Sequence, residues 1–454
     1  MRSNKNRSSL PREPQVLEIE KLSHEGRGLS RYEGRVVFVD GALPGETVRA
    51  AFTNGRSSYA EAQTLEVLKA AAERITPLCP FFQYCGGCSL QHYAASAQLA
   101  FKEGVLHERL EHAVGSSDYR KLAVISGAEF GYRRKARLAV RFVAKKGGVL
   151  VGFKERHSSF ITVMDSCAVL VPEVARLLPL LQVLIGSMHC KEQLPQVEVA
   201  VGDPVPGSNT CALVFRHLQA LDRHDLDLLL AFGGEHGTDI YLQPKGPETV
   251  HRILPIGGEE RLFYTLPEFN LQLAFHPTDF TQVNAGINRQ MVQRAVELLE
   301  LQPADRVLDL FCGLGNFTLP LATKVAQVIG VEGSGAMVER GTENAQRNGI
   351  QNAQFIKADL SLPPEQHAWL KQGFAKVLLD PPRSGALEVL PAVVAARPER
   401  IVYVSCNPAT LARDAAFLAT QGYALAAAGA MDMFPHTSHV EAIALFLPAG
   451  GKRR

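Results

Sequence analysis

Short apolar runs separated by glycines make up the first seventy residues of the chain. Their composition is typical of β-strands, and Pro44-Gly45 is a strong turn signal between two of them. The pattern predicts a small closed or nearly closed β-barrel, although any other small β-domain fits the spacing equally well. The runs lie at residues 16–19, 35–39, 47–52 and 60–68.

The middle of the chain is less regular. A helical pattern extends from about residue 94 to 111, and β-strand patterns occupy residues 131–165. The second of these segments is strongly basic, because residues 131–156 include nine Lys or Arg and one acidic residue, Glu155. Residues 168–265 mix helical and strand patterns and contain no motif that indicates a function.

From residue 284 onward the pattern becomes regular. An amphipathic helix precedes a series of short apolar strands, with helical segments between most of them. This alternation predicts an α/β fold with a parallel, doubly wound, Rossmann-like sheet. The strands lie at residues 306–310, 327–331, 353–357, 375–379, 401–405 and 442–447. We expect four parts: a flexible tail at 1–14, the barrel at 15–70, a small central α+β domain at 71–270 and the α/β domain at 271–454.

The overall composition is that of a folded protein, with 46% of the residues hydrophobic and 21% charged. A chain of 454 residues is long enough for two or three domains. The net charge is only +2, so a nucleic-acid partner would have to meet local groups of basic residues. No apolar stretch has membrane-spanning length, and the polar, basic start does not resemble a secretory signal, so we expect a cytoplasmic protein.

The segment at residues 307–317 predicts a buried strand, a glycine loop and the start of a helix. Gly313 and Gly315 allow the backbone to approach a ligand closely, and Glu332, at the end of the next strand, can bind both hydroxyls of a ribose. A dinucleotide site would have a third glycine, and Asp309 would repel phosphate. The loop therefore favours S-adenosylmethionine, whose ammonium group Asp309 would help to position.

Three acidic residues end successive strands of this domain: Asp309, Glu332 and Asp359. Their placement strengthens the prediction of a cofactor site, because ligands bind at the carboxyl ends of parallel strands. Asp359 lies where the adenine edge would be expected. Alternatively, one or two of the three are ordinary loop carboxylates.

Two further motifs, Asp380–Arg383 and Ser405–Pro408, follow the fourth and fifth strands. We therefore expect Cys406 to face the same crevice as the cofactor. A lone cysteine is usually a small buried hydrophobe. That interpretation suits Cys190 and Cys211, but it suits Cys406 poorly, because Cys406 lies at a strand end.

A thiolate next to a methyl donor has a defined use in pyrimidine chemistry. Carbon 5 of uracil is a weak nucleophile, but thiolate addition to carbon 6 generates an enolate that can attack a methyl sulfonium. Carbon 5 must then lose its proton before the thiolate can leave, which requires a general base. Our candidate base is Glu441, at the start of the last strand, and His439 and His436 are alternatives or residues that orient it.

In their order and spacing, these motifs resemble those of the RNA 5-methyluridine methyltransferase family. The resemblance covers the whole catalytic domain through Asp309–Phe317, Asp380–Arg383, Ser405–Pro408 and His439–Glu441. It implies that Cys406 is the nucleophile and that Glu441 is the base. It also implies cofactor contacts from a Phe-Thr-Gln-Val-Asn segment at 280–284 and from other matching positions, namely Gln282, Phe311, Asn316, Glu332, Asp359 and Asp380.

Three cysteines lie within ten residues with the spacing C-x5-C-x2-C: Cys79, Cys85 and Cys88. With Cys167 they offer four thiolates, and the spacing alone leaves zinc and an iron–sulfur cluster about equally open. The resemblance implies a 4Fe–4S cluster, because the ribosomal-RNA members of the family have this triad with a fourth cysteine placed like Cys167. We expect a structural or RNA-positioning role for the cluster.

The resemblance also bears on the RNA partner. The N-terminal β segment resembles the TRAM domain, an OB-like RNA-binding barrel. This combination of domains implies the branch of the family that methylates uracil 1939 of 23S ribosomal RNA. Apart from the resemblance, we expect a monomer that binds no membrane and needs no obligate protein partner. The alternatives are a transfer-RNA or other ribosomal uridine, and a non-catalytic RNA-binding role. A basic stretch would add contacts to RNA phosphates, and it consists of Arg133, Arg134, Lys135, Arg137 and Arg141. Alternatively, these side chains form only a solvated face of a strand.

Overall fold

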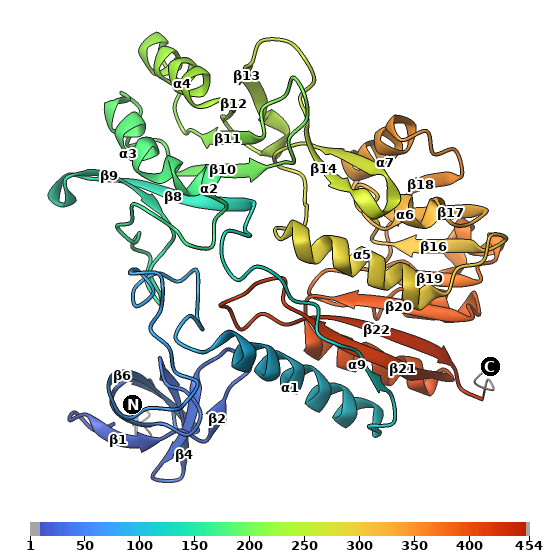
Figure 1. Ribbon diagram of the computed structural model, residues 1–454, viewed down its shortest axis with the longest axis horizontal. Coiled ribbons are helices and arrows are strands. Elements are labelled where there is room, and N and C mark those ends of the chain that lie inside the picture. Colours follow the sequence, from blue (N-terminus) through green and yellow to red (C-terminus); the bar gives the residue numbers. More distant parts are fainter. Residues whose placement is uncertain (1–9, 451–454) are drawn as a thin grey trace, which may run out of the picture. The chain divides into compact units, whose positions relative to one another are not determined.

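The computed structural model describes residues 10–450 (Figure 1). The predicted tail at residues 1–14 therefore lies mostly outside the described residues. The chain forms two compact units. The first comprises the residues up to Val105 together with Phe434–His439, and the second comprises Leu106–Met433 together with the residues from Val440 onward. The division falls within helix α1 (Ala95–Val114).

The first unit contains a six-stranded sheet in the order β1-β5-β6-β4-β3-β2. Its side chains alternate between an apolar core and solvent, so Val37 and Val39 are fully buried. Strand β1 also lies against β3, so the sheet is curled, in agreement with the predicted small β-domain. The strands are β1 (Gln15–Glu18), β2 (Lys21–Leu22), β3 (Gly28–Tyr32), β4 (Arg35–Asp40), β5 (Thr47–Gly55) and β6 (Tyr59–Lys69).

The second unit begins with another six-stranded sheet, in the order β13-β12-β11-β10-β8-β9. Helix α3 packs against β9 and α4 against β12, and a separate hairpin of β14 and β15 follows. This α+β part contains most of residues 168–265, in which no sequence motif indicated a function. Its elements are β8 (Lys135–Val143), β9 (Gly148–Gly152), α2 (Pro172–Ala175), α3 (Leu177–Ser187), β10 (Gln196–Val201), β11 (Cys211–Arg216), α4 (Arg223–His236), β12 (Thr238–Gln243), β13 (His251–Leu254), β14 (Leu262–Leu266) and β15 (Leu271–Phe275).

An eight-stranded sheet forms the rest of the second unit, in the order β18-β17-β16-β19-β20-β22-β21-β7. The first five strands are parallel and are connected largely through helices, as the sequence predicted. The elements are β7 (Arg120–Lys121), α5 (Ala285–Leu299), β16 (Arg306–Leu310), α6 (Thr318–Ala322), β17 (Gln327–Glu332), α7 (Gly335–Arg347), β18 (Ala353–Lys357), β19 (Lys376–Leu379), α8 (Leu390–Ala395), β20 (Arg400–Ser405), α9 (Pro408–Thr420), β21 (Tyr423–Met431) and β22 (Glu441–Pro448).

The far end of this sheet departs from the predicted all-parallel arrangement. Strand β22 runs antiparallel to both β20 and β21, so the sheet is mixed. The sequence did not predict β21, because its segment Tyr-Ala-Leu-Ala-Ala-Ala-Gly-Ala-Met is rich in alanine, which favours helix over strand. The reversal of β22 matters for the site, because its first residue lies at the same edge of the sheet as the last residue of β20.

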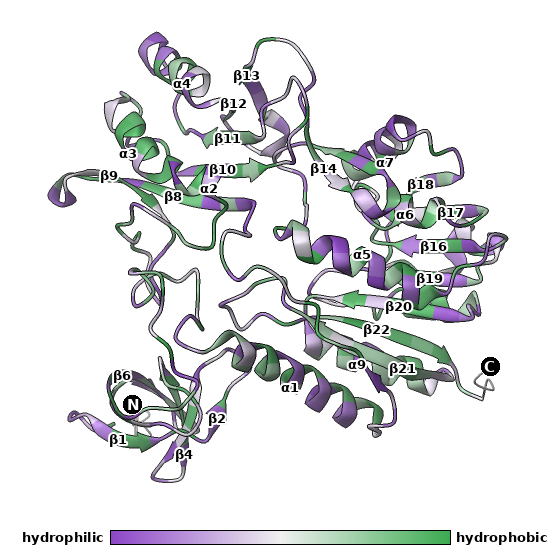
Figure 2. Ribbon diagram, viewed as in Figure 1, coloured by the Kyte–Doolittle hydropathy of each residue, from purple (hydrophilic) through white to green (hydrophobic). Residues whose placement is uncertain are grey.

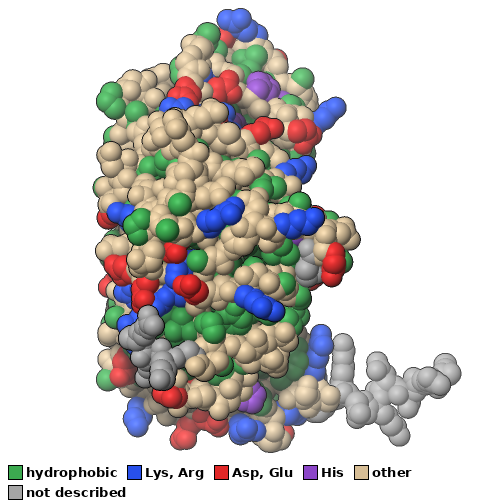
Figure 3. All heavy atoms as spheres, turned by 90° about the vertical axis from the view of Figure 1, so that its right-hand side faces the viewer, with side chains coloured by type: hydrophobic (Ala, Val, Ile, Leu, Met, Phe, Trp, Pro, Cys, Tyr) green, Lys and Arg blue, Asp and Glu red, His purple; other side chains and the backbone are tan. Residues whose placement is uncertain are grey.

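The hydropathy of the elements follows their place in the fold. Strand β22 is hydrophobic over most of its length, and it is buried from Glu441 to Phe446, whereas α1 carries both hydrophilic and hydrophobic stretches (Figure 2). Acidic and basic side chains are interspersed on the face shown in Figure 3, in keeping with the small net charge. Within residues 10–450, no helix is both long and apolar enough to cross a membrane.

Candidate active site

Loops that follow four parallel strands of the eight-stranded sheet line one pocket. Its volume is about 440 Å³, within the usual range for small-molecule sites. Phe311 follows β16, Glu332 ends β17 and Asp359 follows β18, and all three line the pocket. The structure therefore brings together three of the residues predicted to bind the cofactor.

The turn after β16 has a left-handed backbone. The φ angle is +63° at Phe311, +55° at Gly313 and +98° at Gly315. Non-glycine residues in this region are strained, and such strain is concentrated at functional sites. A Cβ atom on Gly315 would lie 3.0 Å from the ring of Phe355 and 3.1 Å from Leu319, so only glycine fits without a shift of its neighbours.

The two acidic residues of the pocket are held by local hydrogen bonds. Glu332 accepts one from the N–H of Gly313 at 3.2 Å and one from the N–H of Ser334 at 2.9 Å, which ties it to the glycine loop. Asp359 is exposed and accepts hydrogen bonds from the hydroxyl and the N–H of Ser361, which lower its pKa. The pocket thus offers fixed carboxylate acceptors for hydroxyl and amino groups of a nucleoside.

Asp309 differs from these residues because it is fully buried within β16. Its Oδ2 accepts a hydrogen bond of 2.5 Å from the Thr318 hydroxyl, whereas Oδ1 has no hydrogen-bond partner among the described residues. Burial raises the pKa of Asp309 to about 8, with a contribution from nearby Asp380. Burial thus favours the protonated form of Asp309, and its predicted help in positioning an ammonium group stays a prediction.

Cys406 and Glu441 come from facing ends of two antiparallel strands. Ser405 of β20 pairs with Ala442 of β22, so Cys406, directly after β20, lies opposite Glu441, the first residue of β22. Glu441 is buried and Cys406 is half-buried. Burial raises the pKa of the Cys406 thiol to about 11, and the charges of Glu441 and Asp380 add to the rise. The fold thus brings the predicted nucleophile and base to one edge of the sheet.

Asp380 connects this edge with the pocket. Its N–H donates to the carbonyl of Leu310 at 3.2 Å, directly before Phe311 of the pocket, and its charge acts on both Asp309 and Cys406. Burial raises the pKa of Asp380 to about 7. The thiol and the pocket therefore belong to one continuous region at the carboxyl ends of the strands.

The two remaining predicted cofactor residues, Gln282 and Asn316, both lie next to Asn288 of α5 and Tyr264 of β14. Gln282 lines a small cavity of about 20 Å³ together with Tyr264 and Asn288. Asn316 exchanges two hydrogen bonds of 2.9 Å with the Asn288 amide and accepts a third of 3.0 Å from the Tyr264 hydroxyl. Sequence analysis missed Tyr264 and Asn288, which lie in no motif, because their role depends on contacts between distant segments.

The two histidines proposed as alternative bases belong to the first unit. His436 is buried, its Nδ1 lies 3.2 Å from the Gln98 amide nitrogen, and its N–H donates to Gln98 Oε1 at 2.9 Å. The ring of His439 packs against Phe434, with 5.5 Å between the ring centroids. Both rings therefore have contacts within the first unit, and the choice of Glu441 as the base stays a prediction.

Three of the predicted metal ligands, Cys79, Cys85 and Cys88, lie in an irregular loop of the first unit, and Cys167 lies in the second. All four are buried and none forms a disulfide. The N–H of Gly87 points to the Cys85 sulfur at 3.4 Å. Buried thiols, one of which accepts from a backbone N–H, have the donor chemistry that a metal or an iron–sulfur cluster requires.

The basic segment around β8 is only partly available to RNA. Arg134 forms an ion pair of 2.5 Å with Asp203, and burial lowers the pKa of Lys135 to about 8. Arg137 and Arg141 are exposed, although Arg137 contacts Glu198. The expectation of five phosphate contacts therefore needs correction, because part of the segment is engaged within the fold.

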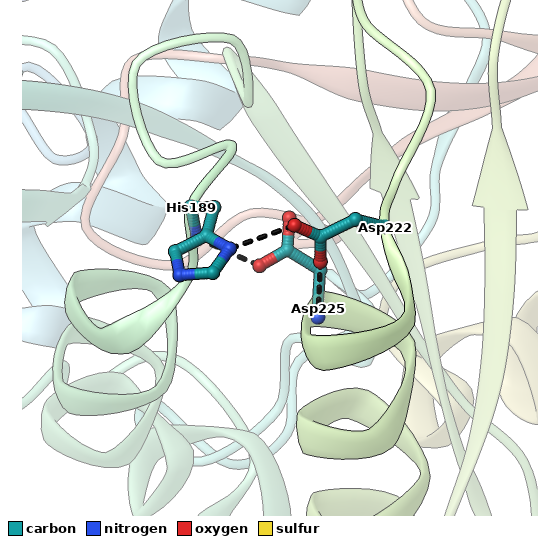
Figure 4. A group of neighbouring side chains, drawn as sticks. All are labelled: His189, Asp222 and Asp225. Carbon is teal, nitrogen blue, oxygen red and sulfur yellow. Dashed lines mark hydrogen bonds and ion pairs between the residues drawn. The ribbon is translucent and has the colours of Figure 1, made fainter.

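One polar group was not predicted from the sequence: His189, Asp222 and Asp225, drawn in Figure 4. Asp222 precedes α4 and accepts hydrogen bonds from the Asp225 N–H at 2.9 Å and from His189 Nδ1 at 2.7 Å. Asp225 in turn accepts from the backbone N–H groups of His189 and Cys190. These contacts cap the helix and fix the preceding loop, so the group has a sufficient structural role.

Comparison with known proteins agrees with this geometry. A family model described as tRNA (Uracil-5-)-methyltransferase matches residues 247–363 and 365–448, which include Gln282, Cys406 and Glu441. A TRAM domain model matches residues 9–65, the region of the curled N-terminal sheet.

Full-length relatives and one solved structure extend the comparison. Two relatives are named 23S rRNA (uracil(1939)-C(5))-methyltransferase RlmD. The protein from Alkalilimnicola ehrlichii is 54% identical over 97% of this chain and 98% of its own length. The protein from Hahella chejuensis is 52% identical over 98% of this chain and 99% of its own length. The crystal structure of Pyrococcus abyssi tRNA (uracil-54, C5)-methyltransferase shares the fold, with a TM-score of 0.71 at 24% identity, covering 96% of this chain and 100% of that one. The chain therefore belongs to the RlmD family of 23S rRNA (uracil(1939)-C(5))-methyltransferases.

Proposed function

We propose that this chain transfers a methyl group from S-adenosylmethionine to carbon 5 of uridine 1939 in 23S ribosomal RNA. The observation that carries the proposal is the placement of Cys406 opposite Glu441, next to the Ser405–Ala442 pair of β20 and β22, beside a pocket lined by carboxylates. Full-length relatives with 52–54% identity carry this activity in their names, which favours the same RNA target.

In the proposed reaction the Cys406 thiol loses its proton to solvent and its sulfur adds to carbon 6 of the uracil. The electron pair of the carbon 5–carbon 6 double bond moves toward the carbonyl at carbon 4, and carbon 5 of the resulting enolate takes the methyl group from the sulfonium. Burial and the charges of Glu441 and Asp380 hold the pKa of the thiol at about 11, so ligand groups that lower this pKa would favour the reaction. A positive charge close to the thiol lowers its pKa and thereby favours the thiolate.

Glu441 completes the reaction as the general base. Its carboxylate removes the proton from carbon 5, the double bond re-forms, and the electron pair of the carbon–sulfur bond returns to Cys406. The position of Glu441 opposite Cys406 supports this role, because both groups must reach the same pyrimidine ring.

The methyl donor would be held by the residues around the pocket. Glu332 would bind the ribose hydroxyls and Asp359 the adenine edge. The volume of about 440 Å³ and the acidic lining suit an adenosine group. The remaining contacts would come from Gln282, Phe311, Asn316 and Asp380.

We further propose that Cys79, Cys85, Cys88 and Cys167 hold a 4Fe–4S cluster. Four buried, reduced cysteines match the ligand number and type of such a cluster. Its role would be structural or in positioning the RNA, since Cys406 and Glu441 supply the nucleophile and the base that the proposed reaction needs.

The other parts of the chain would serve RNA recognition. In this proposal residues 15–70 form an OB-like TRAM barrel that contacts the RNA, residues 71–270 form the iron–sulfur and central domain, and residues 271–454 catalyse the reaction. The protein would work in the cytoplasm and act as a monomer, as expected from the sequence.

Mapping of the modified nucleotide tests the proposed target. Unmodified 23S and transfer RNA are incubated separately with the protein and a labelled methyl donor, and the product base is located by nuclease digestion and mass spectrometry. We expect label only at uridine 1939 of 23S RNA. Label in transfer RNA or at another ribosomal uridine would support the first alternative, and no label in a single turnover would support a non-catalytic role.

A further inference from the structure

A buried carboxylate in the second unit connects three separate segments. Asp203, shortly after β10, is 9% exposed. It accepts a hydrogen bond of 2.5 Å from Arg134, two of 2.7 and 2.8 Å from the hydroxyl and N–H of Thr265, and one of 2.9 Å from Arg289. Burial acts to raise the pKa of Asp203, but the hydrogen bonds from Thr265 and Arg134 outweigh it and lower the pKa.

Two of these partners adjoin residues that hold Asn316, a proposed contact of the methyl donor. Tyr264, which precedes Thr265, donates its hydroxyl to Asn316 Oδ1 at 3.0 Å. Asn288, which precedes Arg289, exchanges two hydrogen bonds of 2.9 Å with the Asn316 amide. The groups that Asp203 fixes on β14 and α5 therefore determine where the Asn316 side chain lies.

The third partner acts on the segment of Gln282, another proposed donor contact. The N–H of Arg134 donates to the carbonyl of Val283 at 2.9 Å, and Arg133 forms an antiparallel bridge with Asn284. The backbone of Arg133 and Arg134 thus holds the segment of Gln282, and the side chain of Arg134 pairs with Asp203. The cavity of about 20 Å³ is lined by partners of Asp203 and by the residues they orient, including Arg134, Tyr264, Thr265, Gln282 and Asn288.

We propose that Asp203 is a positioning residue for the methyl donor. Through Arg134, Thr265 and Arg289 it fixes three segments that orient Gln282 and Asn316. Hydrogen bonds to an ionised and buried carboxylate are strong, and a preorganised site loses less entropy on binding. Loss of Asp203 should therefore weaken binding of the donor and leave the chemistry of Cys406 and Glu441 unchanged. The inference rests on the proposed function, because it takes Gln282 and Asn316 as donor contacts.

The test compares Asp203→Asn with two further variants in the full-length protein. The amide keeps the shape of the side chain but removes the charge and places an NH₂ group against hydrogen-bond donors. We expect about tenfold weaker binding of S-adenosylmethionine by calorimetry and a matching rise in its KM. The KM for RNA should stay within about twofold of the original value. Thr265→Val removes one of the four hydrogen bonds and should give a smaller loss in the same direction.

The matched control is Asp227→Asn, because Asp227 is exposed on α4 and pairs only with Arg223 among the contacts described. It should leave both affinities unchanged. Unchanged donor binding in Asp203→Asn, or equal losses of donor and RNA affinity, would overturn the positioning role. If Asp203→Asn does not fold, Thr265→Val takes its place: a selective loss of donor binding supports the positioning role, and unchanged donor binding or equal losses of donor and RNA affinity overturn it. Donor binding by the unaltered protein is measured first without RNA, and its failure would overturn the proposed function instead.

Discussion

Cys406 and Glu441 lie opposite each other because β22 runs antiparallel to β20, with Ser405 paired to Ala442. If the last strand were parallel to β20, its first residue would lie at the other edge of the sheet, away from Cys406. The reversal of one strand therefore brings a thiol and a carboxylate from two separate motifs to the edge where the pocket opens.

The raised pKa of Cys406 predicts slow alkylation of the unliganded protein. With a pKa of about 11 the thiolate is a small fraction at neutral pH, so reaction with iodoacetamide should accelerate about tenfold per pH unit from pH 7 to 9 without levelling off. The rate is followed by mass spectrometry of the Cys406 peptide. Cys190 and Cys211, buried as the sequence predicted, serve as slow internal references. Asp380→Asn removes a charge that raises the pKa and should speed the reaction, and a plateau below pH 8 would contradict this account.

The neutral acid at Asp309 predicts a pH-dependent stability. The folded protein keeps this proton up to about pH 8, whereas the unfolded chain loses it near pH 3.8. Between these values the folded state binds more protons, so rising pH removes stability. Asp309→Asn cannot ionise, and its amide oxygen can still accept from Thr318. It should be more stable than the original protein at pH 8 by about 5 kcal/mol, because the two pKa values differ by about 4 and each unit corresponds to about 1.4 kcal/mol; the difference should vanish near pH 4.

Urea unfolding at pH 4, 6 and 8 measures that difference. Asp227→Asn, at an exposed position, is the matched control and should show the same small effect at each pH. A difference between Asp309→Asn and the original protein that does not grow from pH 4 to pH 8 would show that Asp309 is ionised in the folded state.

The cysteine assignment predicts an iron protein. Protein purified without oxygen should be brown and contain about four iron and four sulfide per chain, since four thiolates hold one 4Fe–4S cluster. Cys85→Ala should lose the iron and the visible absorption, whereas Cys190→Ala, at a buried cysteine outside the proposed ligands, should keep both. Colourless protein that contains zinc would show that the cysteines hold a different metal.

Local patterns predicted the strands well in the parallel part of the eight-stranded sheet, where helical segments separate most of the strands. The strands expected at residues 306–310 and 353–357 are β16 and β18 with the same bounds. Strand β21 was missed, because its alanines do not indicate a strand and its pairing with β22 is a long-range contact. The direction of β22 could not be predicted for the same reason.

Motifs identified the residues at the strand ends but not the contacts that hold them. Glu332 and Asp359, predicted from their positions after successive strands, line one pocket together with Phe311, which the family resemblance had implied. Asp203 and Tyr264 lie in a stretch without a motif, and their roles follow only from contacts with distant segments. Arg134 appeared to be an RNA contact in the sequence, and its pairing with a buried carboxylate is visible only in the fold.

The covalent mechanism is tested most directly by the Glu441→Gln variant. It is incubated with 23S RNA and a labelled methyl donor and analysed on a denaturing gel, with Cys406→Ala as the control. We predict a covalent protein–RNA adduct that carries the methyl label, because carbon 5 cannot lose its proton, and no adduct with Cys406→Ala although that variant still binds RNA. Normal turnover by either variant, or an adduct that persists without Cys406, would contradict the assignment of nucleophile and base.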